Sequence, residues 1–426
     1  MEDENFSELS IQSPGDASEN PEPHANQEQP NFSNISCEEI DKETISKLRG
    51  DAIGDTMYSQ SSVIRILLQL SDIEWNEKLE EDLCCLWDMT VEKDVCEYLY
   101  QLSFPSIATT IILKYTEPRL IEIIIGILGN ICSNSEVVRD ITDVEIKIVL
   151  NSMDTDDHLI LIQIMRFLIA IIYYRDTKLC FITPNIMEKI CFILSNSTNN
   201  DLLLYTMEAL SKITSDCKLD GELLNGAILE SLLVAFKYIT SKKQRRQSHD
   251  GYNTEINEND MKYINLFVQN VLNLALQINE TSNNGIRVEF LEKSKELLME
   301  FRKIIRKLTE IITTPLSEAN LFYFESFTII FPIFNLKYDR SIYTNLFKMI
   351  SKLVKSSEEK INVFVELIRY LISNGDVSDI VKDSESAKRE TRDVLKYILE
   401  CKYECEFNFK ENLCGVIERI EKNVTD

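Results

Sequence analysis

The stretch RLIEIIIGILGNIC, from Arg119 to Cys132, decides the fold, because it places two glycines and an asparagine inside one of the most isoleucine-rich runs of the chain. Its apolar residues recur at i, i+3, i+4, i+7, i+8 and i+11, which is the spacing of a helix face and not of an alternating strand. These residues are Leu120, Ile123, Ile124, Ile127, Leu128 and Ile131. Ile121 and Ile125 widen the apolar surface, so the segment predicts an α-helix that is buried almost all round.

Charges within two apolar runs argue against a membrane span. A span needs about 20 mainly apolar residues, whereas Arg119 and Glu122 leave only residues 123–135 uncharged in the first run. The longer run LILIQIMRFLIAIIYY, from Leu159, carries Arg166 near its middle, where a charge costs roughly 2.5–3.5 kcal/mol. We therefore interpret both runs as central helices of a soluble helical stack that makes no membrane contact.

The composition favours an all-helical protein that does not bind nucleic acid. Of 426 residues 44% are hydrophobic, but only 11 are glycine and 9 proline, too few for the turns of many short strands. The formal charge of -25 argues against nucleic acid, whose binding comes largely from Lys and Arg that displace counterions. The N-terminus MEDENFSELS lacks the basic and apolar segments of a secretory signal, so we expect the 11 cysteines to be reduced.

Similar helix cores recur at Asn130 (ILGNIC), Ala170 (FLIAIIYY), Lys212 (ALSKIT) and Asn273 (VLNLAL). They lie 40, 42 and 61 residues apart, and about 40 residues is the period of armadillo and HEAT units. A polar segment, residues 241–260, accounts for the longer step as an inserted basic and polar loop. Helix-start signals agree with many short helices and occur at Asp154 with Asp157, Asn199 with Asn200, and Ser356 with Glu359.

The first 41 residues differ from everything after them. They hold 11 Asp and Glu, four prolines and neither Lys nor Arg, so they cannot bury enough apolar area to offset the entropy of ordering. We predict a disordered acidic tail at residues 1–50 and an armadillo-like helical repeat domain at residues 51–426. The predicted fold class is all-α, a right-handed superhelical stack of armadillo/HEAT-like repeats, because each helix needs its neighbours to bury its apolar face.

Four segments carry a family resemblance: IGDTMYS (Ile53 to Ser59), CCLWDMTVEKDV (Cys84 to Val95), RLIEIIIGILGNIC, and ICFILSNSTNNDLL (Ile190 to Leu203). In this order and spacing they resemble the serum amyloid A-like protein family, an armadillo-like group associated with promotion of fibroblast proliferation. The resemblance covers residues of about 53–203. It implies a non-enzymatic intracellular protein in the nucleus and cytoplasm.

Asn130 is the main candidate for partner binding. The segment ILGNIC is similar to the third helix of an armadillo unit, where an Asn on the concave face can hydrogen-bond the backbone of an extended peptide. Gly126 stands where the usual aromatic residue would lie one turn earlier. Asn273 is a second candidate, and Glu122 would make the groove acidic and favour basic peptides. The structural alternative is that Gly126 and Gly129 permit close helix approach around a satisfied Asn, beside a solvated Glu122.

A dense basic cluster lies in the predicted loop and consists of Lys242, Lys243, Arg245 and Arg246. Short basic runs of this kind serve as nuclear import signals, and the alternative is a solvated loop. Ser248 follows Arg245 and Arg246 at the spacing of a basophilic kinase site. A phosphate there would add about two negative charges beside the cluster and could mask it.

Catalytic and metal-binding patterns are missing from the sequence. The chain has three histidines, and Cys401 and Cys405 have no His nearby that would complete a zinc site. No P-loop and no GxGxxG motif occurs. We therefore expect no catalytic residue, cofactor, metal or small-molecule substrate. An enzymatic alternative would need a cysteine of depressed pKa beside His158. Trp87 follows a run of leucines at helical spacing and is predicted to be a core anchor.

Two function hypotheses remain open from the sequence. The first is a non-enzymatic armadillo-like scaffold that binds protein or peptide partners on its concave surface and, by the resemblance, acts in promoting cell proliferation. The alternative is a transport adaptor that carries basic cargo between cytoplasm and nucleus. A groove lined by several Asn and acidic residues in register would favour the adaptor.

Overall fold

The computed structural model describes residues 50–174, 181–219, 221–247, 258–311, 317–355, 362–375 and 379. Within these ranges the regular elements are helices, and the strand-like pairing is one isolated bridge between Ala52 and Ser59. In chain order the helices are α2 (Gln60–Gln69), α3 (Glu77–Met89), α4 (Lys93–Gln101), α5 (Phe104–Lys114), α6 (Pro118–Cys132), η2 (Val138–Asp140), α7 (Asp143–Asn151), α8 (His158–Tyr174), α9 (Pro184–Asn196), α10 (Asn200–Asp216), η3 (Gly221–Leu223), α11 (Gly226–Gln247), α12 (Glu258–Glu280), α13 (Asn284–Glu292), α14 (Ser294–Ile311), α15 (Glu318–Ile333), α16 (Arg340–Lys355) and α17 (Asn362–Ser373).

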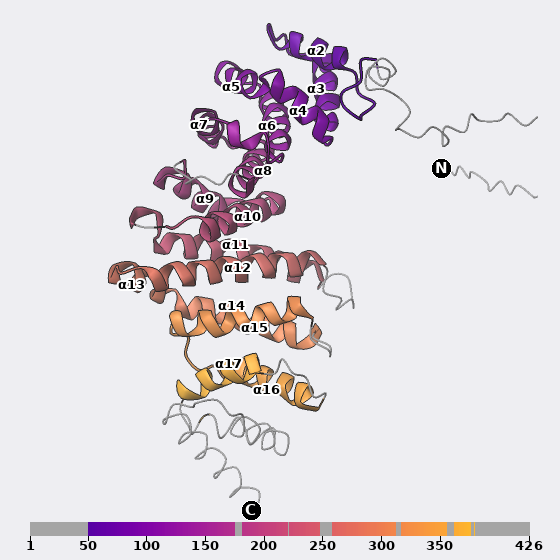
Figure 1. Ribbon diagram of the computed structural model, residues 1–426. Helices are drawn as coiled ribbons and strands as arrows, with labels where there is room; N and C mark the ends of the chain where they lie inside the picture. The colour runs from indigo at the N-terminus through magenta and orange to yellow at the C-terminus, as the bar shows by residue number, and fades with distance from the viewer. Residues whose placement is uncertain are drawn as a thin grey trace, which may run out of the picture. The chain divides into compact units, whose positions relative to one another are not determined.

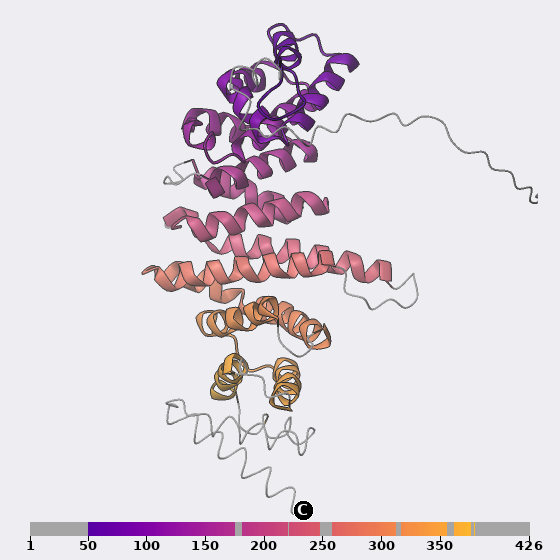
Figure 2. The same ribbon diagram turned by 45° about the vertical axis from the view of Figure 1, so that its right-hand side comes forward.

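The helices pack in two parallel rows, as an armadillo/HEAT-like stack does. One row, here called the ladder row, runs α3, α6, α8, α10, α12, α15 and α17, and each of these helices contacts the next. In the other row, called the outer row, α5 contacts α7, α9 contacts α11, and α11, α14 and α16 follow in turn. Figures 1 and 2 show the helices from α5 to α17 in successive layers. The all-α prediction is confirmed, and the stack continues through α17.

Local sequence signals explain where several helices begin. The side chain of Asn199 accepts hydrogen bonds from the backbone N–H of Asp201 (2.9 Å) and Leu202 (3.0 Å), which caps α10. Asp157 accepts from the N–H of Leu159 at 2.8 Å and caps α8. Both caps confirm predicted helix starts. The third predicted start, Ser356 with Glu359, lies outside the described residues.

The predicted repeat anchors fall on successive helices of the ladder row. Lys212 on α10 places its ammonium 4.8 Å from the centre of the Tyr173 ring on α8. Asn273 on α12 donates to the carbonyl oxygen of Ser211 on α10 at 3.0 Å. The period of about 40 residues therefore corresponds to one step along the ladder row.

The predicted loop at residues 241–260 is shorter than expected. Helix α11 continues to Gln247 and α12 already begins at Glu258, so the longer step between repeats is met largely by two long helices. The segment SKKQRRQ, residues 241–247, holds no Pro or Gly, and its Lys, Arg and Gln residues are good helix formers, which is why the helix does not end at Ser241.

The core changes character along the stack. Around α6 and α8 it is built from isoleucine and leucine, whereas from α11 onward phenylalanine rings form a continuous chain. Phe236 of α11 stacks on Phe267 of α12 with ring centres 4.1 Å apart, and Phe324 of α15 lies 4.3 Å from Phe364 of α17. The first pair joins the two rows, because α11 belongs to the outer row and α12 to the ladder row, whereas the second pair joins neighbouring helices of the ladder row.

One described segment, residues 221–241 around α11, is long and apolar enough to cross a membrane by length and composition alone. In its apolar stretch of 18 residues, 56% is buried by the rest of the protein, as in the core helix of a stack. The predicted acidic tail lies outside the described residues, apart from residue 50.

Candidate partner-binding face

The two glycines of α6 face different neighbouring helices. A Cβ on Gly126 would lie 2.2 Å from Cζ2 of Trp87, so the indole of α3 rests directly on the α6 backbone at that point. A Cβ on Gly129 would lie 3.8 Å from the backbone of Phe167 on α8, an ordinary contact. The aromatic group that the sequence lacks at position 126 is thus supplied by α3. Trp87 is partly buried and packs against the core, as predicted.

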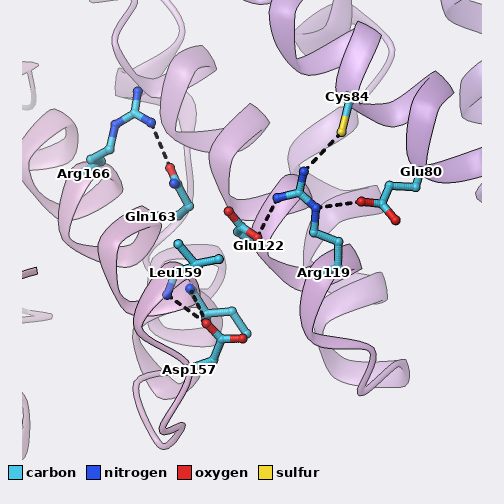
Figure 3. Close-up of polar contacts among 9 residues, drawn as sticks. Glu80, Cys84, Arg119, Glu122, Asp157, Leu159, Gln163 and Arg166 are labelled. Carbon is cyan, nitrogen blue, oxygen red and sulfur yellow. Dashed lines mark hydrogen bonds and ion pairs between the residues drawn. The ribbon is translucent and has the colours of Figure 1, made fainter. Parts of the chain in front are cut away.

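Arg119 ties the first turn of α6 to α3. It donates from Nε to Glu80 at 2.9 Å, from Nη1 to Glu122 at 2.7 Å and from Nη2 to the Cys84 sulfur at 3.4 Å, as Figure 3 shows. The hydrogen bonds with Glu122 and Glu80 raise the pKa of Arg119. The side chain of Glu122 is 7% exposed. Glu122 is therefore buried and paired with Arg119, and it neither lines an acidic groove nor faces solvent.

Asn130 joins α3, α6 and α8 through one polar chain. Its Nδ2 donates to Oγ1 of Thr90 at 2.9 Å, and its Oδ1 accepts from Nη2 of Arg166 at 3.4 Å. Arg166 also donates from Nη1 to Gln163 at 2.9 Å (Figure 3). Asn130 and Arg166 are half-buried, so this chain reaches the surface. The amide is satisfied within the protein, and its assignment to a peptide-binding groove stays a prediction.

The exposed strip of the ladder row continues from Arg166 across α8 and α10. Ile169 and Tyr173 follow Arg166 on one side of α8, since they lie three and seven residues further along a helix. Tyr173 is 62% exposed and contacts Lys212 of α10. We call the strip formed by Asn130, Arg166, Tyr173 and Lys212 the ladder face. It presents two cations and one exposed aromatic ring.

Asn273 lies inside the stack rather than on this face. It is 6% exposed, and its Nδ2 donates to the carbonyl oxygen of Ser211 at 3.0 Å and to Oγ1 of Thr214 at 3.1 Å. Its Oδ1 accepts from Gln269 at 2.8 Å. These contacts hold α12 against α10 and leave the amide little capacity for a ligand. The role predicted for Asn273 in partner binding is therefore not favoured by its position.

The basic cluster belongs to the end of α11. Lys242, Lys243, Arg245 and Arg246 fall within the helix as it runs to Gln247, and not in a loop as expected. Ser248 lies outside the described residues. Its assignment as a phosphorylation site stays a prediction, as does that of the cluster as an import signal.

Burial makes several of the described thiols poor nucleophiles, whereas Cys85 is exposed. Burial raises the pKa of Cys96 and of Cys217 to about 12, and it raises the pKa of Cys132 and Cys191 as well. His158 lines an open hollow of about 1260 Å³ between α8, α9 and the segment that joins α7 to α8, and the described lining of this hollow includes no cysteine. Among the described residues no group of three or more His, Cys, Asp or Glu is placed to hold a metal ion.

Known proteins resemble this chain over part of its length. The SAAL1 C-terminal domain is a family whose model matches residues 186–252. Protein saal1 of Danio rerio is 32% identical over 209 residues, which is 44% of each chain. Protein SAAL1 of Homo sapiens is 30% identical over 188 residues, 38% of this chain and 40% of that one. The chain is similar to SAAL1 proteins. The matches span less than half the length of these relatives, and the SAAL1 model reaches further along the chain than the segments that carry the resemblance.

Two solved structures with a related arrangement are a designed and an engineered protein. A designed armadillo repeat protein, YIII(Dq)4CqI, matches with a TM-score of 0.40 at 11% identity and covers 62% of this chain and 98% of its own. An engineered protein, target OR497, matches with a TM-score of 0.43 at 14% identity over 89% of this chain and 94% of its own. At these scores the armadillo-like description rests on the helix contacts given above.

Proposed function

We propose that the protein is a non-catalytic armadillo-like scaffold that binds a segment of a partner protein across the ladder face. The observation that carries the proposal is the contact between Tyr173 and Lys212, in which an exposed ring and a cation are held at 4.8 Å, two helical turns along α8 from the anchored Arg166. Aromatic and Arg side chains that are already ordered lose little entropy on binding, and such groups dominate protein interfaces.

The charges on the ladder face oppose the adaptor hypothesis. A groove for basic cargo needs unpaired carboxylates in register, whereas Glu122 is paired with Arg119 and the next positions along the row are Arg166 and Lys212. A basic segment would bring its cations against these two. A partner segment that is neutral or acidic fits the face better.

The process and the compartment are further parts of the proposal. Similarity to SAAL1 proteins and the resemblance to their family support a role in promoting cell proliferation. The basic cluster at the end of α11 supports entry into the nucleus from the cytoplasm. Fusing the chain to a fluorescent protein and replacing the four basic residues with Ala tests this step, because the nuclear fraction falls only if the cluster acts in import.

The binding face is tested by quantitative affinity purification from cells. The test variant is Tyr173→Ala/Lys212→Ala, and the matched control is Phe192→Ala, which removes a ring that is 67% exposed on α9 of the outer row. All three proteins must first show the same melting temperature. We expect the test variant to lose a defined set of partners that the control retains.

Two results would contradict this assignment. If the test variant keeps its full partner set, the ladder face does not bind them. If the control loses the same partners, exposed aromatic rings in general hold them and the face has no special role. An unchanged partner set with slower cell growth would separate the proliferation role from this face.

A further inference from the structure

Positive charge is concentrated on two neighbouring helices of an otherwise acidic chain. Helices α14 and α16 together carry nine Lys and Arg against three Glu, and α16 has no acidic residue. The whole chain has a formal charge of -25. The two helices contact each other as consecutive members of the outer row (Figure 1). Four of these cations, Arg302, Arg306, Arg340 and Lys348, line one groove of the outer row.

A groove of about 710 Å³ runs between α14 and α16. Arg302 and Arg306 line it on α14, and Arg340, Thr344 and Lys348 line it on α16. Within each helix these residues are four positions apart, which places them one turn, or about 6 Å, apart along the axis. The groove thus has two rows of polar side chains, with hydroxyl donors between the cations.

The contacts within the groove anchor one end, while Arg306 and Lys348 lie exposed further along it. Both nitrogens of the Arg302 fork bond to Asp339, whose Oδ1 also accepts from the backbone N–H of Ile342 at 3.0 Å and so caps α16. Arg306 bonds to Glu310 at 3.4 Å, but these side chains are 73% and 62% exposed, and such a pair is easily exchanged for a ligand carboxylate. Lys348 is exposed.

We propose that this groove binds an extended acidic segment of a partner protein, with Asp or Glu at alternate positions. In an extended chain, alternate side chains point to the same side and recur about every 6.6–6.8 Å. This repeat matches the spacing of about 6 Å between groove positions one helical turn apart. Successive carboxylates can therefore meet Arg306 and the row from Arg340 to Lys348, while the intervening residues face solvent.

The length of the groove favours this occupant over a single anion. Arg340 and Lys348 are eight residues apart, which corresponds to about 12 Å along α16. One phosphate group is too small to reach both ends, whereas a segment of a few residues spans them. The main chain of such a segment can also accept hydrogen bonds from the Thr and Asn side chains of α16 that line the groove.

Fluorescence anisotropy with the full chain tests the proposal. The probe is a labelled twelve-residue peptide in which Glu alternates with Ser, and the first control peptide replaces every Glu with Gln. A second control peptide has the same composition with its Glu residues in one block. The test variant is Arg306→Glu/Lys348→Glu, and the matched control variant, Lys262→Glu/Lys295→Glu, makes the same change of charge at exposed positions outside the groove.

We expect the alternating peptide to bind the wild type and the control variant alike, and to bind the test variant about tenfold or more weakly, because two favourable charge contacts become repulsive. The Gln peptide should not bind. The proposal is overturned if the alternating peptide does not bind, or if both variants lose it equally. If the block peptide binds as tightly as the alternating peptide, the proposed match between alternate carboxylates and the groove cations is refuted. If a phosphoserine peptide or single-stranded DNA binds more tightly, the groove serves a different occupant.

Discussion

Replacing Gly126 with Ala should destabilise the protein, although the same change at Gly129, three residues later, should not. At Gly126 the new methyl group would lie 2.2 Å from Cζ2 and 2.4 Å from Cε2 of Trp87, 1 Å or more closer than ordinary contact, which begins at 3.4 Å. Both atoms belong to the rigid indole, so relief requires the whole ring or the α3 backbone to move. Overpacking of this kind costs about 1–3 kcal/mol.

The helix itself gains from either substitution. Ala is favoured over Gly in a helix interior by about 0.8–1.0 kcal/mol, which offsets part of the clash at Gly126 and is the whole effect at Gly129, where the methyl group meets only a contact of 3.8 Å. The free energy of unfolding should fall by up to about 2 kcal/mol for Gly126→Ala and rise by about 0.5–1 kcal/mol for Gly129→Ala. The two variants thus differ in sign within one helix.

Urea unfolding monitored by circular dichroism measures both changes, and hydrogen exchange localises them. In Gly126→Ala the amides of α3 and α6 should exchange faster, while those of α15 and α17 stay as in the wild type. In a Trp87→Leu background the indole is gone, so Gly126→Ala should become stabilising. The reasoning fails if Gly126→Ala is as stable as the wild type, or if its effect is unchanged when Trp87 is removed.

Three further outcomes follow from single contacts. Glu122→Gln should cost about 1–2 kcal/mol in unfolding free energy, because Arg119 loses a buried charged partner; equal stability in a urea titration would show that the pair contributes nothing. At pH 8 iodoacetamide should alkylate the exposed Cys85 long before the buried Cys96, because the raised pKa of Cys96, about 12, keeps its thiol protonated. Mass spectrometry of timed samples measures the order of alkylation, and the reverse order would contradict this reasoning. Thr142→Ala removes the capping box of α7 and should cost about 1 kcal/mol, while Thr142→Ser should restore most of it.

The helical period of the sequence was sufficient to predict the fold class. The spacing from Leu120 to Ile131 depends only on local geometry, and so do the caps at Asp157 and Asn199, which is why these predictions hold. The loop predicted at residues 241–260 is too long, because polar residues such as Lys, Arg and Gln also form helices. The absence of Pro and Gly from residues 241–247 was the better guide.

The surroundings of the candidate site residues could not be obtained from the sequence. Trp87 fills the space above Gly126 from 39 residues away, and only the packing of α3 on α6 shows it. The pair of Arg119 with Glu122 did leave a local signal, since residues three apart are neighbours on a helix. Burial of that pair depends on Glu80 and Cys84 of α3, which no spacing within α6 reveals.

An acidic chain can still attract acidic partners, because charge acts over short distances in salt. At physiological ionic strength the screening length is about 8 Å, so the charge of -25 spread over the chain is not felt as a whole by a segment that approaches α14 and α16. What such a segment meets is the local excess of Lys and Arg. The net charge meanwhile opposes non-specific binding of nucleic acid, whose long phosphate backbone would extend beyond the groove onto acidic surface. A small basic surface on an acidic protein therefore selects short acidic segments over long polyanions.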